Sequence, residues 1–543
     1  MQNTRSPWAR CSKYVSTTHS CIVAGYVYHH YKHKFDMFPI AIINLILLKT
    51  YFWQMFPNIK QSLLKSNSDD QRQIIMNDMR SLFYSIQRWN SEIYAMFTKS
   101  IIINYLWQIV DKSNNDNLIN DTLWFIAEMQ NQNIYNQSVV HENGLQILLK
   151  VLRKCINCNI ATNGFYILSQ VADSNPQRKM LLINNVCFKL FWSKMQTFNS
   201  FIVSNLHYLS LWSNASLLLC NLSTTTFSSA NMKYFFKMLF SIMSFSIKIQ
   251  SDPQNTSIKR QLILNQILIN GTLTLYKLTQ NSSNIDTIIN EFRKNPNFLT
   301  KCVQLMRYKN SKRVRNYTIL WINHIFAQNV NFPHNVDILL QNGVLMEYIA
   351  FAKQEKSYGT ETTNILISLS NLLLWNKQHR LVILNDSTLL NFITTNLYHK
   401  DSLVVMAALD CVNNILQFKQ EEDAWSLLLK YNHGKVFDGI CHILNDKNKQ
   451  RWQSLTHENV INIMDCLRNI SHLIESNCTS TKWIQIKLKQ ANVIDIIKFN
   501  LHLICNKKDQ NGKTINVVNI NFMTNLALKN YIPAIEQLTQ SLK

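Results

Sequence analysis

The sequence has few of the residues that build turns. It contains 9 glycines and 8 prolines among 543 residues, whereas a many-stranded β fold needs more of both at its connections. Charged residues make up 16% of the chain and hydrophobic residues 47%, so there is ample material for a continuous apolar core. These shortages favour helices, arranged either in several domains or in one long repeat array.

Acidic residues are also scarce. The chain has 32 Asp and Glu against 55 Lys and Arg, which gives a net charge of +23. A positive field of this size favours acidic proteins, nucleic acid or anionic lipid as partners. The basic residues are spread along the chain, however, and heavy use of Asn, Ile and Lys is also what a codon bias produces. Charge alone therefore leaves the class of partner open.

Long apolar runs are absent as well. A bilayer-spanning helix needs about eighteen or more apolar residues, and the run from Met37 to Leu48 is ended by Lys49. We therefore expect a soluble protein with no membrane partner. Residues 1–35 lack Asp and Glu but carry several Arg and Lys, which is compatible with a transit peptide. A poorly ordered leader followed by a core helix is the favoured alternative.

Catalytic motifs do not occur. There is no Gly-x-Ser-x-Gly elbow and no dinucleotide-binding glycine fingerprint. Gly512-Lys513-Thr514 resembles the end of a phosphate-binding loop, but the glycine needed five residues earlier is Lys507. Without that glycine the backbone cannot wrap a phosphate. The sequence predicts that the protein is not an enzyme and needs no cofactor.

Metal-binding patterns are incomplete. Cys155 and Cys158 have zinc-like spacing, but no second pair follows at the usual distance, so buried or loop thiols are the favoured interpretation. A histidine cluster near the N-terminus fits a surface group in a basic leader better than a metal site. Most of the 12 cysteines fall in apolar helical runs, as in a reducing compartment. No metal site is predicted.

An internal repeat determines the predicted fold. Three passages share a short apolar helix, a break, a helix of about ten residues, a polar loop and a longer helix. Gly, Asn and Asp suit the breaks because they tolerate the left-handed conformation that ends a helix. The passages are 136–173, 335–374 and 380–418, with breaks at Asn143-Gly144, Asn342-Gly343 and Asn385-Asp386.

This three-helix unit resembles the armadillo repeat. Its third helices carry a recurring late polar residue, here called the anchor, in steps of roughly 42 to 56 residues. The longer steps require loop insertions, for example at Gln250 to Ser257 and Asn445 to His457. We expect an all-α, armadillo-type solenoid, a right-handed superhelix of about nine units, with residues 1–80 as a basic leader and first helices and 81–543 as the solenoid. A HEAT array of helix pairs is the alternative. The anchors are Glu128, Gln170, Asn221, Lys277, His324, Asn371, Asn414, Asn469 and Asn525.

The anchors resemble those of importin α, the nuclear import adaptor. In that family the third helices carry Trp, then Asn four residues later; the tryptophans make slots for lysine stems and the asparagines clamp the peptide backbone. Trp124 with Glu128, and Tyr166 with Gln170, have this spacing, while the Asn anchors keep the amide alone. No anchor has a complete Trp-x-x-x-Asn. A net charge of +23 also departs from the acidic groove of the family.

Three functions follow as expectations. The resemblance implies an adaptor that holds extended peptides, including nuclear localisation signals, works with an importin β-like carrier, and occupies cytoplasm and nucleus. The second is a general scaffold for acidic proteins, based on the cluster Lys309, Lys312, Arg313 and Arg315. RNA binding, with Tyr308 and Trp321 near that cluster, ranks last. For each anchor an ordinary hydrogen bond between helices is the competing explanation.

Overall fold

A computed structural model describes most of residues 61–444. The gaps are 63–64, 67, 87–101, 132–139, 175, 185–186, 200–205, 225–228, 251–256, 328–332, 355–358, 376 and 417–434. All elements within these described residues are helices. None of the described helices is both long and apolar enough to cross a membrane. The chain divides into two compact units, unit 1 (Met1–Gly271) and unit 2 (Thr272–Lys543).

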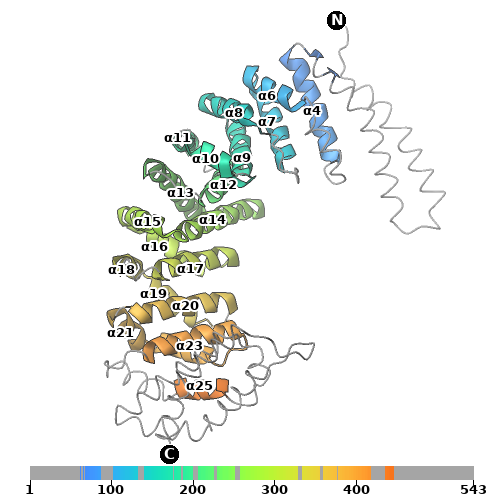
Figure 1. Cartoon of the computed structure of the whole chain (residues 1–543). Coiled ribbons are helices and arrows are strands. Elements are labelled where there is room, and N and C mark those ends of the chain that lie inside the picture. Colours follow the sequence, from blue (N-terminus) through green and yellow to red (C-terminus); the bar gives the residue numbers. More distant parts are fainter. Residues whose placement is uncertain are drawn as a thin grey trace, which may run out of the picture. The chain divides into compact units, whose positions relative to one another are not determined.

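Unit 1 is a succession of packed helices (Figure 1). Among its third helices, α7 packs against α4, α9 against α7, and α12 against α9. Helix α6 contacts α7, helices α8 and α10 contact α9, and α13 contacts α12. The elements are α4 (Asp69–Ile86), α6 (Ile102–Lys112), α7 (Asp116–Asn131), α8 (Glu142–Lys154), α9 (Cys158–Ser174), α10 (Pro176–Asn184), α11 (Cys187–Asn199), α12 (Leu206–Leu222) and α13 (Ser229–Gln250).

Unit 2 repeats the same arrangement as helix triples. The third helices α17, α20 and α23 pack side by side in chain order (Figure 1), which confirms the predicted all-α, armadillo-type solenoid. Helix α14 (Ile258–Thr279) runs through the boundary between the units. The other elements are α15 (Ser282–Lys294), α16 (Pro296–Gln304), the 3₁₀ turn η2 (Leu305–Arg307), α17 (Lys312–Ala327), α18 (Pro333–Gln341), α19 (Val344–Ala352), α20 (Gly359–Trp375), α21 (Lys377–Asn385), α22 (Ser387–Asn396), α23 (Ser402–Leu416) and α25 (Lys435–Leu444).

Two of the three predicted breaks lie where the sequence places them, for different reasons. Gly343 separates α18 from α19 with a φ of 92°, a left-handed conformation that glycine adopts without strain. Asp386 separates α21 from α22 in an extended conformation, with φ at −92°. Its carboxylate accepts hydrogen bonds from the Thr388 and Leu389 amides, both at 2.9 Å. Asp386 is therefore an N-cap and not a left-handed residue.

The third predicted break, at Asn143-Gly144, is wrong. Both residues lie in the first turn of α8, which His141 caps by accepting a hydrogen bond from the Gly144 amide at 2.9 Å. A Cβ on Gly144 would lie 2.7 Å from the ring of the buried Trp107. The glycine permits close packing of α8 on α6, a requirement that sequence alone does not distinguish from a turn.

Residues 251–256 of the loop insertion predicted at Gln250 to Ser257 lie outside the described residues. The helices on either side of it, α13 and α14, are each 22 residues long. Leu209, Ile249 and Leu264, from α12, α13 and α14, form one apolar cluster. The second predicted insertion, Asn445 to His457, lies outside the described residues.

Two buried cations close helix ends. The Lys194 ammonium donates to the carbonyl oxygen of Cys155, the C-cap of α8, at 2.6 Å. The Arg380 guanidinium donates to the Leu373 carbonyl, in the last turn of α20, at 2.8 Å. Carbonyls at a helix C-terminus lack partners and carry partial negative charge, so a cation is stabilised there. Lys194 and Arg380 therefore stabilise helix ends, so part of the excess of basic residues has a structural role.

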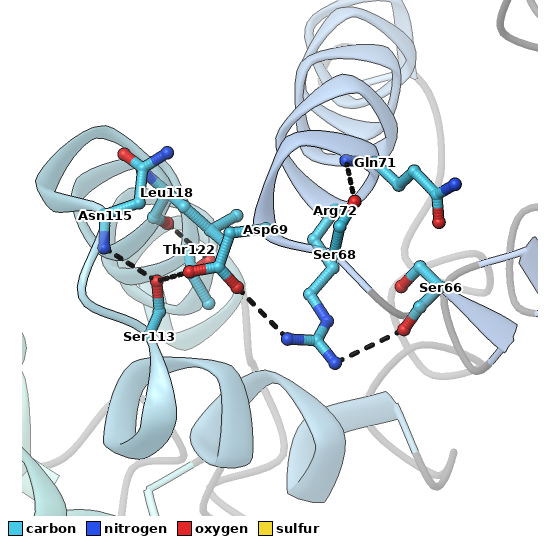
Figure 2. Close-up of polar contacts among 9 residues, drawn as sticks. All are labelled: Ser66, Ser68, Asp69, Gln71, Arg72, Ser113, Asn115, Leu118 and Thr122. Atoms are coloured by element: carbon cyan, nitrogen blue, oxygen red, sulfur yellow. Dashed lines mark hydrogen bonds and ion pairs between the residues drawn. The ribbon is translucent and has the colours of Figure 1, made fainter. Parts of the chain in front are cut away.

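A polar network fixes α4 against the turn between α6 and α7 (Figure 2). The Asp69 carboxylate accepts from the Ser113 hydroxyl at 2.7 Å and from Arg72 at 3.1 Å. Ser113 in turn accepts from the Asn115 amide at 3.0 Å, and Arg72 also donates to the Ser66 carbonyl at 3.2 Å. These bonds set the position of α4 beside α7. Helix α4 continues through residue 80, where the sequence analysis divides leader from solenoid.

Candidate peptide-binding face

Within each unit, a row of half-buried side chains follows the third helices. On α23 the residues Val405, Leu409 and Val412 are buried, while Met406, Asp410 and Asn414 are half-buried and recur every four residues. This spacing keeps them on one helix face, turned away from the core. The same pattern occurs on the other third helices, and we name these positions the stripe. Its members in unit 1 are Trp124, Glu128, Tyr166, Gln170, Leu217 and Asn221, and in unit 2 Lys277, Leu320, His324, Ile367, Asn371, Asp410 and Asn414.

The described asparagine anchors bond to the preceding third helix. The Asn221 amide nitrogen donates to the Ser169 carbonyl at 2.9 Å. Asn371 donates to the Asn323 side-chain oxygen at 3.1 Å, and Asn414 donates to the Ser370 carbonyl at 2.9 Å and hydroxyl at 2.8 Å. Each anchor thus joins two neighbouring repeats. We call these hydrogen bonds the asparagine staples.

Further staples of the same kind lie two turns earlier, and the sequence analysis missed them. Asn163 donates to the Asn120 side-chain oxygen at 3.0 Å, and Asn214 donates to the Thr162 carbonyl at 3.0 Å. Both lie seven residues before an anchor of the same helix, at almost two full turns. A second polar residue at this spacing is the signal that would have revealed them.

Glu128, Tyr166 and Trp124 lie together on α7 and α9. Burial raises the pKa of the Glu128 carboxyl. Burial, and then the charge of Glu128, raise the pKa of the Tyr166 phenol. The Trp124 ring is covered by the Arg80 guanidinium of α4, 4.6 Å from the ring centroid, and Arg80 also pairs with Asp121 at 3.0 Å. The predicted aromatic slot therefore contains an acid and already holds one cation of the chain itself. Gln170 follows one turn after Tyr166.

An aromatic group occupies the stripe at the start of unit 2. The rings of Tyr276 and Tyr317 are stacked with centroids 6.1 Å apart, and Tyr276 meets His324 edge-on at 5.1 Å. Burial lowers the pKa of His324, partly offset by a hydrogen bond with the Thr279 backbone. Lys277 follows Tyr276 on α14 and is half-buried. At neutral pH, therefore, Lys277 is the charged one of these two anchors, whereas the anchors Asn371 and Asn414 further along the unit are neutral amides.

The remaining predicted residues divide into three groups. Asn469 and Asn525 lie outside the described residues, as do the N-terminal histidines and Gly512. Cys155 and Cys158 are at the junction of α8 and α9, where burial raises the pKa of the Cys158 thiol to about 11 and also raises that of Cys155. The described part of the chain contains no group of His, Cys, Asp and Glu that could hold a metal ion. Trp321 is fully buried and so cannot stack on a base.

Comparisons with known proteins support the fold alone. No known protein family and no curated protein matches the sequence. An engineered protein from a structural genomics consortium has a similar structure, with a TM-score of 0.60 and 12% identity over 89% of this chain and 98% of that chain. A designed armadillo repeat protein aligns over 55% of this chain and 99% of its own, with 15% identity and a TM-score of 0.35, too low to carry an argument. The helix triples define an armadillo-type repeat protein.

Proposed function

We propose that this protein is a binding scaffold in which the stripe of each unit holds an extended polypeptide segment. The observation that carries the proposal is the row of half-buried side chains on consecutive third helices. On most third helices an apolar or aromatic residue alternates with a polar one, which is an amide at Gln170, Asn221, Asn371 and Asn414. The row therefore offers a peptide apolar surface to pack against and polar groups to hydrogen-bond. Because the staples engage the amide nitrogens, the asparagine oxygens are the groups that accept from peptide N–H groups.

A charge placed on the stripe tests this proposal. We select binders from a displayed library of random unstructured peptides, then compare Ile367→Glu, on the α20 part of the stripe, with Val382→Glu on α21. Val382 is 53% exposed, and the two changes introduce the same side chain. Peptides that bind the stripe should lose affinity for the Ile367 variant because a charge is placed among desolvated contacts. Thermal melting of both variants confirms that each is folded.

An import adaptor is the finer candidate, and the Glu128 cluster favours it. A half-buried carboxylate beside Tyr166 and Trp124 suits a lysine or arginine, whose stem covers an aromatic ring while its charge meets the acid. We propose that unit 1 binds a basic localisation signal here, which would place the protein in cytoplasm and nucleus with an importin β-like carrier. Arg80 over Trp124 would then compete with the incoming cation.

Glu128→Gln should raise stability and weaken binding together. Because burial raises the folded-state pKa above the ordinary 4.5, ionisation of Glu128 opposes folding, and this cost develops as pH rises from about 4.5 through the raised pKa. The variant should therefore melt higher than wild type at pH 7, with the difference vanishing in acid. It should bind a lysine-rich localisation peptide about tenfold more weakly, the loss of one charged partner.

Glu142→Gln is the matched control, because this acid is exposed on α8. It should change neither the melting temperature nor the affinity for the lysine-rich peptide, measured by fluorescence anisotropy. If Glu128→Gln binds the peptide as tightly as wild type does, no lysine or arginine of the peptide pairs with Glu128. The scaffold proposal would survive that result, but the import proposal would not.

A further inference from the structure

One continuous stretch of unit 2 contains no acid. Between Glu291 and Asp337 the sequence has eight Lys and Arg and neither Asp nor Glu. This stretch forms the end of α15, all of α16 and η2, and α17. Three of its cations pair with acids from outside the stretch, namely Lys294 with Glu291, Arg307 with Glu347, and Arg315 with Glu361. Part of the basic excess of the chain therefore lies in this stretch.

Of the other five cations in this stretch, three lie together at the beginning of α17, while Arg293 is on α15 and Lys301 is on α16. Lys309 lies in the preceding turn, while Lys312 and Arg313 are the first two residues of the helix, and all three are exposed. We name these three residues the basic edge. The first turn of α17 contains no acid, although the positive end of a helix dipole disfavours cations there. An external anion would offset this unfavourable arrangement.

The basic edge is held in a fixed geometry by Arg315. Its guanidinium donates to the Tyr308 carbonyl at 2.8 Å and to the buried Glu361 carboxylate at 2.9 Å. The first bond closes the turn that carries Lys309, and the second ties α17 to α20. A surface that is ordered before binding loses little conformational entropy when a partner arrives.

We infer that the basic edge, about two turns before Leu320, the first stripe residue of α17, binds an acidic segment of a protein partner. Charge complementarity selects an anion, and a short one, because the basic edge consists of three residues and the cations Arg307 and Arg315 on either side are already paired with buried acids. A nucleic acid fits less well. Non-specific binding of single strands uses exposed aromatic platforms, whereas here Trp321 is buried and Tyr308 is half-buried.

The test uses the full chain and a fluorescein-labelled glutamate-rich peptide of about ten residues, followed by anisotropy at roughly 50 mM salt. The variant is Lys309→Gln with Lys312→Gln and Arg313→Gln. The matched control is Lys154→Gln with Lys189→Gln and Lys233→Gln, three exposed lysines of unit 1. Both have the same net charge. We expect at least about tenfold weaker binding for the first and less than about twofold for the second.

Three results would overturn the inference. Equal losses in the two triple variants would show that net charge alone attracts the peptide. An absence of wild-type binding at low salt would show that the basic edge is an ordinary solvated surface. Tighter binding of a single-stranded oligonucleotide of equal charge, weakened by the Lys309, Lys312 and Arg313 changes, would assign the surface to nucleic acid.

Discussion

Arg315→Met is expected to destabilise unit 2 by about 3–5 kcal/mol, the cost typical of removing one partner of a buried ion pair. The Glu361 side chain is fully buried and that of Arg315 is 15% exposed, so solvent cannot replace the lost partner. One of the Glu361 oxygens already has no hydrogen-bond partner, and the variant leaves the whole carboxylate without its cation. The measurement is urea unfolding followed by circular dichroism.

Two further variants separate the ion pair from general effects. Arg313→Met changes an exposed arginine of the same helix and should cost less than about 0.5 kcal/mol. Adding Glu361→Met to Arg315→Met should recover most of the loss, because apolar side chains of similar volume replace a buried pair well. If Arg315→Met and Arg313→Met unfold at the same urea concentration, the carboxylate is not desolvated as described.

Asn414→Ala is expected to cost about 1–3 kcal/mol, because it removes a staple and leaves buried acceptors on α20 without their donor. Asn414 makes two hydrogen bonds to Ser370, whose side chain is 8% exposed. Since the bonds join α23 to α20, hydrogen exchange should show faster opening of α23 than of α17. Leu403→Ala, an exposed position of the same helix (64% exposed), is the control and should leave exchange in α23 close to wild type.

The helical repeat was predictable because it depends on periodicity. The third helices predicted around Asn371 and Asn414 are observed as α20 and α23, since apolar residues on three sides of a helix leave one face for polar groups. The positions of the breaks between helices were predicted less well. Gly343 and Gly144 look alike in sequence, but the first has a left-handed backbone and the second accommodates Trp107. Only tertiary contacts distinguish these two uses of glycine.

The roles of the polar anchors were not predictable in full. A pattern identifies the face on which Asn221 lies but not its partner, the Ser169 carbonyl, because that partner is set by how two helices pack. Arg315 shows the same limit. In sequence it belongs to a basic cluster with Lys312 and Arg313, whereas in the structure it is paired with Glu361, 46 residues later. Because the partner is far away in the sequence, the pattern alone does not show that Arg315 forms a structural ion pair between α17 and α20.

The comparison of Ile367→Glu with Val382→Glu tests the central claim most directly. The measured quantity is the dissociation constant of each selected peptide for the two folded variants and for wild type. We predict at least about tenfold weaker binding to the Ile367 variant, equivalent to roughly 1.4 kcal/mol or more, and unchanged binding to the Val382 variant. Equal affinities for both variants would contradict the account, since the stripe would then be a solvated face that binds no peptide.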